Sequence, residues 1–199
     1  MLVTPDFITI VSGLPRSGTS LMMQMLQAGG LPVLSDGLRG ADENNLRGYL
    51  EYEPVKRLRS DRSWLPQAQG QAVKIIHLLL RDLLLDGSLR YRILFMQRPV
   101  AEVLDSQRVM LARDGKAAGD PALLHKAFES QLAQLEAWFP TQAPLAVLPV
   151  SYHQVMAEPE LVAQAVQGFL GVDLDLAAMA RAVDPALHRQ RLPLPTLRR

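Results

Sequence analysis

The residues best suited to chemistry stand together in one short segment, Gly13-Leu-Pro-Arg-Ser-Gly-Thr-Ser20. Its glycines allow the backbone to approach a ligand closely, Thr19 and Ser20 offer hydroxyl donors, and Arg16 is a permanent cation. The planar guanidinium of arginine matches the oxygens of phosphate or sulfate. An apolar run, Phe7–Ser12, precedes the segment and a helical pattern follows it, so the loop amides and the positive helix end should point at one spot. The segment therefore predicts a cradle for a multiply charged anion.

One position separates this loop from the usual triphosphate-binding signature, G-x-x-x-x-G-K-[ST]. Thr19 replaces the lysine of that signature, and the cation stands at Arg16 instead. Kinases and triphosphatases use the lysine on the β- and γ-phosphates, together with carboxylates that hold Mg²⁺. The loop therefore favours phosphate binding without metal-dependent triphosphate chemistry. Because His125, His153 and His188 also lack metal-ligand spacing, we predict no metal site.

The elements that must hold this loop follow from the spacing of apolar residues. Buried strands are predicted at Phe7–Ser12 and Tyr91–Gln97, a short strand at Leu31–Leu34 and a late strand at Leu145–Val150, and Ala72–Ile76 is a further apolar run. Helices are predicted from Leu21 to the stop at Gly29–Gly30, over Glu53–Arg62 as a solvated helix, over His77–Leu85, from Pro99 through Val109, through Leu132 to Trp138, and over Glu158–Leu170. This alternation predicts an α/β fold, a three-layer αβα sandwich with a parallel sheet, of the P-loop-containing nucleotide-binding type.

Length and composition set the class of protein. The 199 residues, 48% hydrophobic and 21% charged, suit one hydrophobic core, so we predict a single domain over residues 1–199. A formal net charge of +1 gives no field that would attract nucleic acid or an anionic membrane, and neither is expected as a partner. The absence of cysteine, of a signal-peptide pattern and of an apolar run near the roughly 20 residues of a membrane span predicts a cytoplasmic protein.

The glycine-rich loop resembles the 5′-phosphosulfate loop of the sulfotransferase family, whose members take a sulfuryl group from 3′-phosphoadenosine 5′-phosphosulfate (PAPS). Its arginine form is similar to that of tyrosylprotein sulfotransferases and many bacterial relatives. The resemblance implies that PAPS is the co-substrate. It also implies that the loop residues bind PAPS: Pro15, Arg16, Ser17, Gly18, Thr19 and Ser20.

A second segment, Phe95-Met-Gln-Arg-Pro-Val-Ala-Glu-Val-Leu-Asp-Ser106, resembles the 3′-phosphate motif of the same family. In that motif an arginine ends a strand and a serine lies on the next helix. The resemblance implies that Arg98 binds the 3′-phosphate by charge and Ser106 by hydroxyl donation. The alternative is a surface ion pair for Arg98 and a solvent-facing Ser106.

Two further stretches, Val150–Pro159 and Asn44–Glu51, are similar to segments of the family. The chain departs from the cytosolic enzymes in lacking their glycine- and lysine-rich segment that closes over the 3′-phosphate. Arg189 and Arg191, in the basic C-terminal tail, are candidates to replace that segment.

Sulfuryl transfer by in-line displacement needs donors on the leaving group, which Arg16 and the loop amides would supply, and a base for the incoming hydroxyl or amine. Three residues are candidates for the base. Asp36 resembles in its spacing the catalytic glutamate of tyrosylprotein sulfotransferases, His77 resembles the catalytic histidine of cytosolic members displaced by one residue, and Glu51 lies in the Gly-Tyr-Leu-Glu stretch. Each has a structural alternative, namely loop solvation or helix capping for Asp36, a satisfied helix-start histidine for His77 and a surface charge for Glu51. Lys74 is a candidate second cation near the sulfate or a strand-end charge.

The leading interpretation is a PAPS-dependent sulfotransferase acting on a small-molecule or carbohydrate-like acceptor. Two alternatives stand beside it. One is a nucleotide kinase or phosphotransferase on the same scaffold, and the other is a nucleotide-binding domain without turnover.

Overall fold

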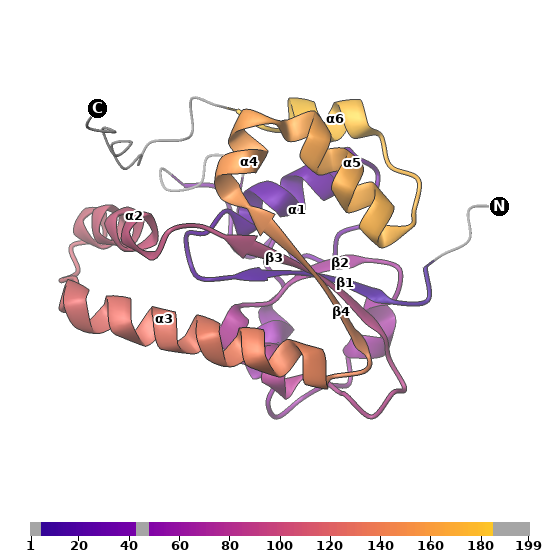
Figure 1. Cartoon of the computed structure of the whole chain (residues 1–199), viewed down its shortest axis with the longest axis horizontal. Coiled ribbons are helices and arrows are strands. Elements are labelled where there is room, and N and C mark those ends of the chain that lie inside the picture. The colour runs from indigo at the N-terminus through magenta and orange to yellow at the C-terminus, as the bar shows by residue number, and fades with distance from the viewer. Residues whose placement is uncertain (1–4, 43–47, 185–199) are drawn as a thin grey trace, which may run out of the picture.

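The fold is built on a parallel sheet of four strands, seen edge on in Figure 1. The computed structural model describes residues 5–42 and 48–184. The strands are β1 (Ile8–Gly13), β2 (Ala72–Lys74), β3 (Tyr91–Gln97) and β4 (Leu145–Ser151), in the spatial order β2-β1-β3-β4. All three pairings are parallel. The carboxyl ends of the strands therefore meet at one edge of the sheet, where the glycine-rich loop begins.

Helices cover both faces of the sheet (Figure 1). The α-helices are α1 (Thr19–Ala28), α2 (Val100–Arg113), α3 (Pro121–Trp138), α4 (Tyr152–Ala157), α5 (Pro159–Leu170) and α6 (Leu176–Arg181). Short 3₁₀-helices are η1 (Glu53–Arg57), η2 (Leu65–Ala68), η3 (His77–Asp82) and η4 (Phe139–Thr141). In the described part of the chain, no helix combines the length and the apolar character needed to cross a bilayer.

Two hydrophobic cores lie on opposite faces of the sheet, and the alternation of side chains along each strand separates them. Leu94 and Met96 of β3 pack in the core that contains α1, α5 and α6. Tyr91, Ile93 and Phe95 of the same strand pack in the other core, beside η1, η2, η3 and α3. Because both faces are covered, the strands are apolar almost without interruption. The predicted α/β sandwich with a parallel sheet is confirmed.

Two predicted α-helices are wrong. The segment His77–Leu85 forms only the 3₁₀-helix η3, and buried side chains recur every third residue at His77 and Leu80 within it and at Leu83, its C-cap. That period suits the three residues per turn of a 3₁₀-helix. The predicted solvated helix Glu53–Arg62 is the short 3₁₀-helix η1, with a proline in its first turn and a buried Val55.

The predicted strand at Leu31–Leu34 is also wrong, since it reduces to one isolated parallel bridge between Val33 and Ala72. By contrast, the stop at Gly29–Gly30 is confirmed, because α1 ends at Ala28 and Gly29 is its C-cap.

Candidate functional site

The glycine-rich loop joins the carboxyl end of β1 to the start of α1, and its backbone depends on two glycines. Gly13 has φ 148° and Gly18 has φ 102°. A Cβ at Gly18 would stand 2.5 Å from Tyr152 Cδ2, and one at Gly13 would stand 2.7 Å from the Met96 carbonyl oxygen. The loop is therefore packed against β3 and α4 as closely as its backbone allows.

Substitution of Gly18 by alanine is expected to abolish anion binding and lower the melting temperature, because the new methyl group meets the Tyr152 ring. Gly87 is the matched control, since it has φ 87° but open space around the position of a Cβ. Both alanine variants carry a left-handed backbone cost of roughly 1–2 kcal/mol. Calorimetric titration and thermal melting should show lost binding only for Gly18→Ala. Equal behaviour of the two variants would mean that strain, not the close approach, decides the effect.

Arg16 and Ser106, predicted from separate motifs, meet in the structure. Arg16 lies in the left-handed region at φ 68°, a strained conformation for a side-chain-bearing residue. Its Nε donates to Ser106 Oγ at 3.1 Å. Burial lowers the pKa of Arg16 from its ordinary value, partly offset by the nearby Tyr49. Arginine remains a cation throughout the physiological range.

Arg98 follows β3 and reaches the same loop. Its Nη1 donates to the Arg16 carbonyl oxygen at 3.2 Å, and its guanidinium carbon lies 4.4 Å from the centroid of the Tyr152 ring. Ser106 lies four residues beyond Glu102 on α2, so both face the loop side of that helix, and both are buried. The structure thus brings the two predicted binding motifs into contact, although they come from different strands.

Lys74, the last residue of β2, is buried beside the start of α1. Its Nζ donates to Ser20 Oγ at 3.0 Å and to the Tyr49 carbonyl oxygen. Burial lowers the pKa of Lys74 to about 8, against the opposing attraction of Glu51, whose Oε1 lies 3.6 Å from Nζ. A third basic side chain therefore adjoins the loop, and its pKa of about 8 lies close to neutral pH.

Glu51 is held by two cations. Arg39 Nη1 donates to both carboxylate oxygens of Glu51, at 3.1 and 3.3 Å, and Lys74 Nζ lies 3.6 Å from Oε1. The Arg39 guanidinium also stacks at 3.5 Å on the ring of Tyr49, whose hydroxyl donates to the Asp42 carboxylate. Burial raises the pKa of Tyr49. Of the three candidate bases, Glu51 is the one in contact with a residue that touches the loop.

The other two candidate bases have different partners. Asp36 accepts hydrogen bonds from the backbone N–H groups of Glu53 at 2.6 Å and Leu38 at 3.0 Å, and these bonds lower its pKa. His77 is buried, and its Nε2 lies 2.8 Å from Gln131 Oε1 of α3. The contacts of Asp36 thus order the loop after α1, and those of His77 join η3 to α3.

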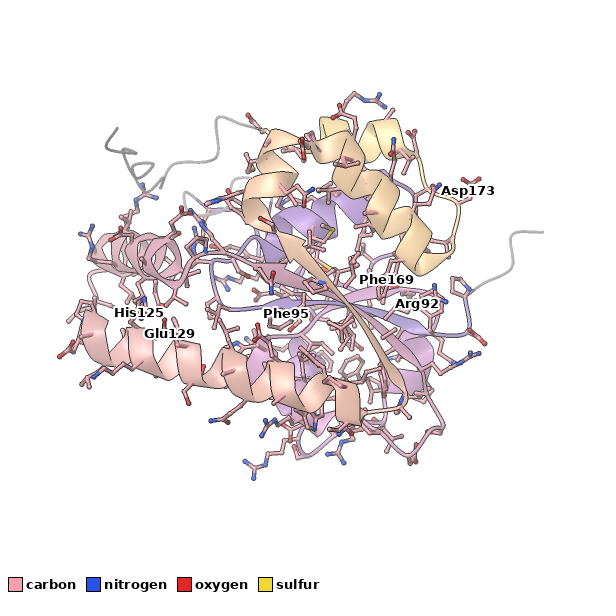
Figure 2. The ribbon with its side chains drawn as sticks, in the orientation of Figure 1. Arg92, Phe95, His125, Glu129, Phe169 and Asp173 are labelled. Atoms are coloured by element: carbon pink, nitrogen blue, oxygen red, sulfur yellow. The ribbon has the colours of Figure 1, made fainter. Side chains whose placement is uncertain are left out.

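The remaining loop residues differ in burial. Pro15 is exposed, whereas Ser17 is buried and its Oγ has no hydrogen-bond partner in the described part of the chain. A buried hydroxyl of this kind is a ready donor for a ligand oxygen. Ser17 and Arg98 also line a cavity of about 270 Å³ between the strand ends and α3. Phe95, another lining residue, is labelled in Figure 2.

Three residues of the site were missed as functional candidates in the sequence: Glu102, Tyr152 and His153. Only Glu102 carries a local signal, since it stands four residues after Arg98, a spacing that pairs charges on a helix. Among the described residues, no three histidine, aspartate or glutamate side chains gather in a way that could hold a metal ion.

Comparison with protein-family models and with the sequences of curated proteins finds no match. Solved structures do match. The sulfotransferase domain of the Synechococcus PCC 7002 olefin synthase superposes with a TM-score of 0.57 at 17% identity, over 97% of this chain and 90% of that one. The sulfotransferase domain from the curacin biosynthetic pathway gives 0.54 at 13%, over 97% and 94%. A sulfotransferase from Alicyclobacillus acidocaldarius gives 0.50 at 13%, over 94% and 89%. The chain therefore has a sulfotransferase-like fold.

Proposed function

We propose that this chain transfers a sulfuryl group from PAPS to a hydroxyl or amine of a small-molecule or carbohydrate-like acceptor. The observation that carries the proposal is the convergence of three basic side chains on one glycine-built loop that lacks the triphosphate lysine. Arg16 belongs to the loop, Lys74 touches Ser20, and Arg98 touches the Arg16 carbonyl oxygen. The sulfotransferase-like fold supports the same conclusion.

The residues present fit a nucleotide with anionic groups at its 5′ and 3′ positions. The loop amides, the hydroxyls of Thr19 and Ser20, and the buried Ser17 Oγ offer donors for the 5′ side. Arg98 and Ser106 offer a cation and a hydroxyl for the 3′ side. When bound, the donor supplies an activated sulfuryl group on a bisphosphate leaving group.

Arg16 and Lys74 would stabilise the negative charge that develops on the leaving group, because Arg16 in the loop and Lys74 beside it are both held by hydrogen bonds before any reaction begins. Their burial strengthens this effect, since a low local dielectric increases the interaction between charges. Arg98 would orient the nucleotide through its 3′ side.

Glu51 is our choice for the base that accepts the acceptor's proton, at one of its carboxylate oxygens. Its side chain is 29% exposed and lies 3.6 Å from Lys74 Nζ, so it is both reachable and next to the loop. Asp36 contacts the backbone N–H groups of Leu38 and Glu53, which lie beyond α1 and not on the glycine-rich loop, and His77 is only 2% exposed. A base has to lie within hydrogen-bond reach of the proton it takes.

Variants that replace each of the three candidate bases by an amide test this choice. Glu51→Gln is expected to lower kcat by roughly 10²–10⁴-fold with little change in bisphosphate affinity, because only the proton acceptor is lost. Asp36→Asn and His77→Gln serve as matched comparisons and should keep most of their turnover. A large loss of kcat in either of them, with Glu51→Gln active, would transfer the role to that residue.

The first test of the function itself is calorimetric titration with adenosine 3′,5′-bisphosphate and, separately, with ATP–Mg²⁺. Tight bisphosphate binding with weak ATP binding is expected, and would justify an acceptor screen with PAPS. Preference for ATP–Mg²⁺ would contradict the proposal and favour a phosphotransferase. Bisphosphate binding without turnover on any acceptor would favour a nucleotide-binding domain.

A further inference from the structure

Glu102 is a buried carboxylate in the first turn of α2, and its side chain is only 3% exposed. Oε2 accepts from Arg98 Nε at 2.9 Å, and His153 Nε2 lies 2.9 Å from Oε1 and 3.0 Å from Oε2. Burial pushes the pKa of Glu102 upward, but the hydrogen bonds from His153 and Arg98 outweigh it, and the net pKa is lowered. Glu102 is therefore a carboxylate anion enclosed between two donors from different elements.

Arg98 is held in one orientation by its contacts. Its Nε donates to the Glu102 carboxylate and its Nη1 donates to the Arg16 carbonyl oxygen. The Tyr152 ring lies against its flat face, with 4.4 Å between the guanidinium carbon and the ring centroid. The guanidinium side chain is 6% exposed. A guanidinium is planar, so fixing its Nε edge and its face also fixes the direction of the Nη edge. The carboxylate thus aims the Nη edge of Arg98 at the glycine-rich loop.

We propose that Glu102 is a positioning residue that holds Arg98 in register with the glycine-rich loop, with His153 fixing the carboxylate through contacts to both of its oxygens. The inference rests on the proposed function in one respect, namely that Arg98 meets the 3′-phosphate of the nucleotide. Glu102 touches neither the nucleotide nor the acceptor in this scheme. Through the orientation of Arg98 it affects the preference for ligands that carry a 3′-phosphate.

Stabilisation of the fold alone does not explain a buried carboxylate and guanidinium pair at Glu102 and Arg98. A buried ion pair often contributes nothing net to folding compared with apolar residues of similar volume, because both charges lose water. The chain also offers a matched comparison on α3. His125 Nδ1 and Glu129 Oε2 form a pair at 3.3 Å, with side chains 40% and 60% exposed (Figure 2). Glu129→Gln removes the same chemical group from this exposed pair.

The test compares adenosine 3′,5′-bisphosphate with adenosine 5′-monophosphate by calorimetry, in the wild type, Glu102→Gln and Glu129→Gln. The ratio of the two affinities measures recognition of the 3′-phosphate. We expect Glu102→Gln to lower this ratio roughly tenfold or more, as for the loss of a charged hydrogen bond, and Glu129→Gln to leave it unchanged. A lower melting temperature of Glu102→Gln with an unchanged ratio would overturn the inference, because that is the result of a purely structural role.

Two additions keep the test decisive. If Glu102→Gln does not fold, Glu102→Asp keeps the charge but shortens the side chain by one methylene, and the ratio should still fall. The second readout needs no ligand: hydrogen exchange of the Arg98 Nε–H group by NMR, with the signal assigned from its loss in Arg98→Lys. We expect roughly tenfold faster exchange in the Glu102 variants. Unchanged exchange would overturn the inference. A wild type that binds neither nucleotide would sink the proposed function, while the exchange readout would still decide the role of Glu102.

Discussion

Replacement of Arg16 by alanine is expected to lower kcat/KM for sulfuryl transfer by roughly 10²–10³-fold, the usual loss when one preorganised donor to a transition state is removed. Arg16 is the cation of the loop itself, and its backbone is already held at φ 68° by the surrounding structure. Since alanine has the same difficulty as arginine in that conformation, the melting temperature should change little. Steady-state kinetics with PAPS and thermal melting measure the two effects.

Two variants sharpen this experiment. Arg59→Ala removes an exposed arginine and should leave kinetics and melting unchanged. Arg16→Gly removes the same side chain but relieves the strain of the left-handed backbone. It should therefore be as inactive as Arg16→Ala and melt at a higher temperature than Arg16→Ala. Full activity of Arg16→Ala would contradict the assignment of the loop as the site of the sulfuryl donor.

Substitution of Lys74 by methionine should remove a pH dependence of nucleotide binding. The pKa of Lys74 is lowered to about 8, mainly by burial, so raising the pH through that value neutralises the amine and weakens anion binding. An anion bound nearby favours the protonated form, so binding to the wild type at pH 8 should take up as much as about half a proton. Calorimetry of bisphosphate binding in buffers of different ionisation enthalpy measures that uptake.

The same measurement contains its own controls. At pH 6 Lys74 is already protonated, so its contribution to proton uptake should vanish in the wild type. Lys74→Met should bind the bisphosphate more weakly at pH 6 and lose the uptake attributed to Lys74 at pH 8. Identical uptake in the wild type and in Lys74→Met would show that another group titrates and that Lys74 is not the charge next to the ligand.

The lowered pKa of Lys74 also affects folding. A rise in pH weakens anion binding, but it increases the contribution of Lys74 to the free energy of unfolding. The unfolded chain holds the Lys74 proton up to its ordinary pKa of 10.5, whereas the folded chain releases it near 8. Between these values the unfolded state binds more protons, so the contribution of Lys74 to the free energy of unfolding rises with pH. Below pH 8 the cost of the buried ammonium is fully present.

Much of the fold and the position of the glycine-rich loop could be predicted because the relevant signals are contiguous in the sequence. The apolar run before Gly13 and the helical spacing after Ser20 place the loop between a strand and a helix without any tertiary information. The burial of β3 on both faces is likewise visible in the four consecutive apolar residues Ile93–Met96 at its centre. Local patterns of this kind do not depend on the rest of the chain.

The errors and omissions arise where tertiary packing decides. The leucine-rich segment after Lys74 has the composition of an α-helix, yet packing every third side chain against the sheet makes it a 3₁₀-helix. Tyr152 joins the site because its ring lies against Gly18, a contact between residues far apart in the chain. His153 is one of several scattered histidines in the sequence, and 51 residues separate it from Glu102. No spacing rule connects such positions.

The site also draws on every strand of the sheet. The loop follows β1, Lys74 ends β2, Arg98 follows β3, and Tyr152 and His153 follow β4. A nucleotide that contacts these groups can bind only after all the parallel pairings, each separated by a long stretch of chain, have formed. Its binding energy therefore adds to the free energy of global unfolding rather than to that of one segment. Amide protons in β1, β3 and β4 should gain protection together when the bisphosphate binds, which makes the ligand a reporter of the cooperativity of the whole sheet.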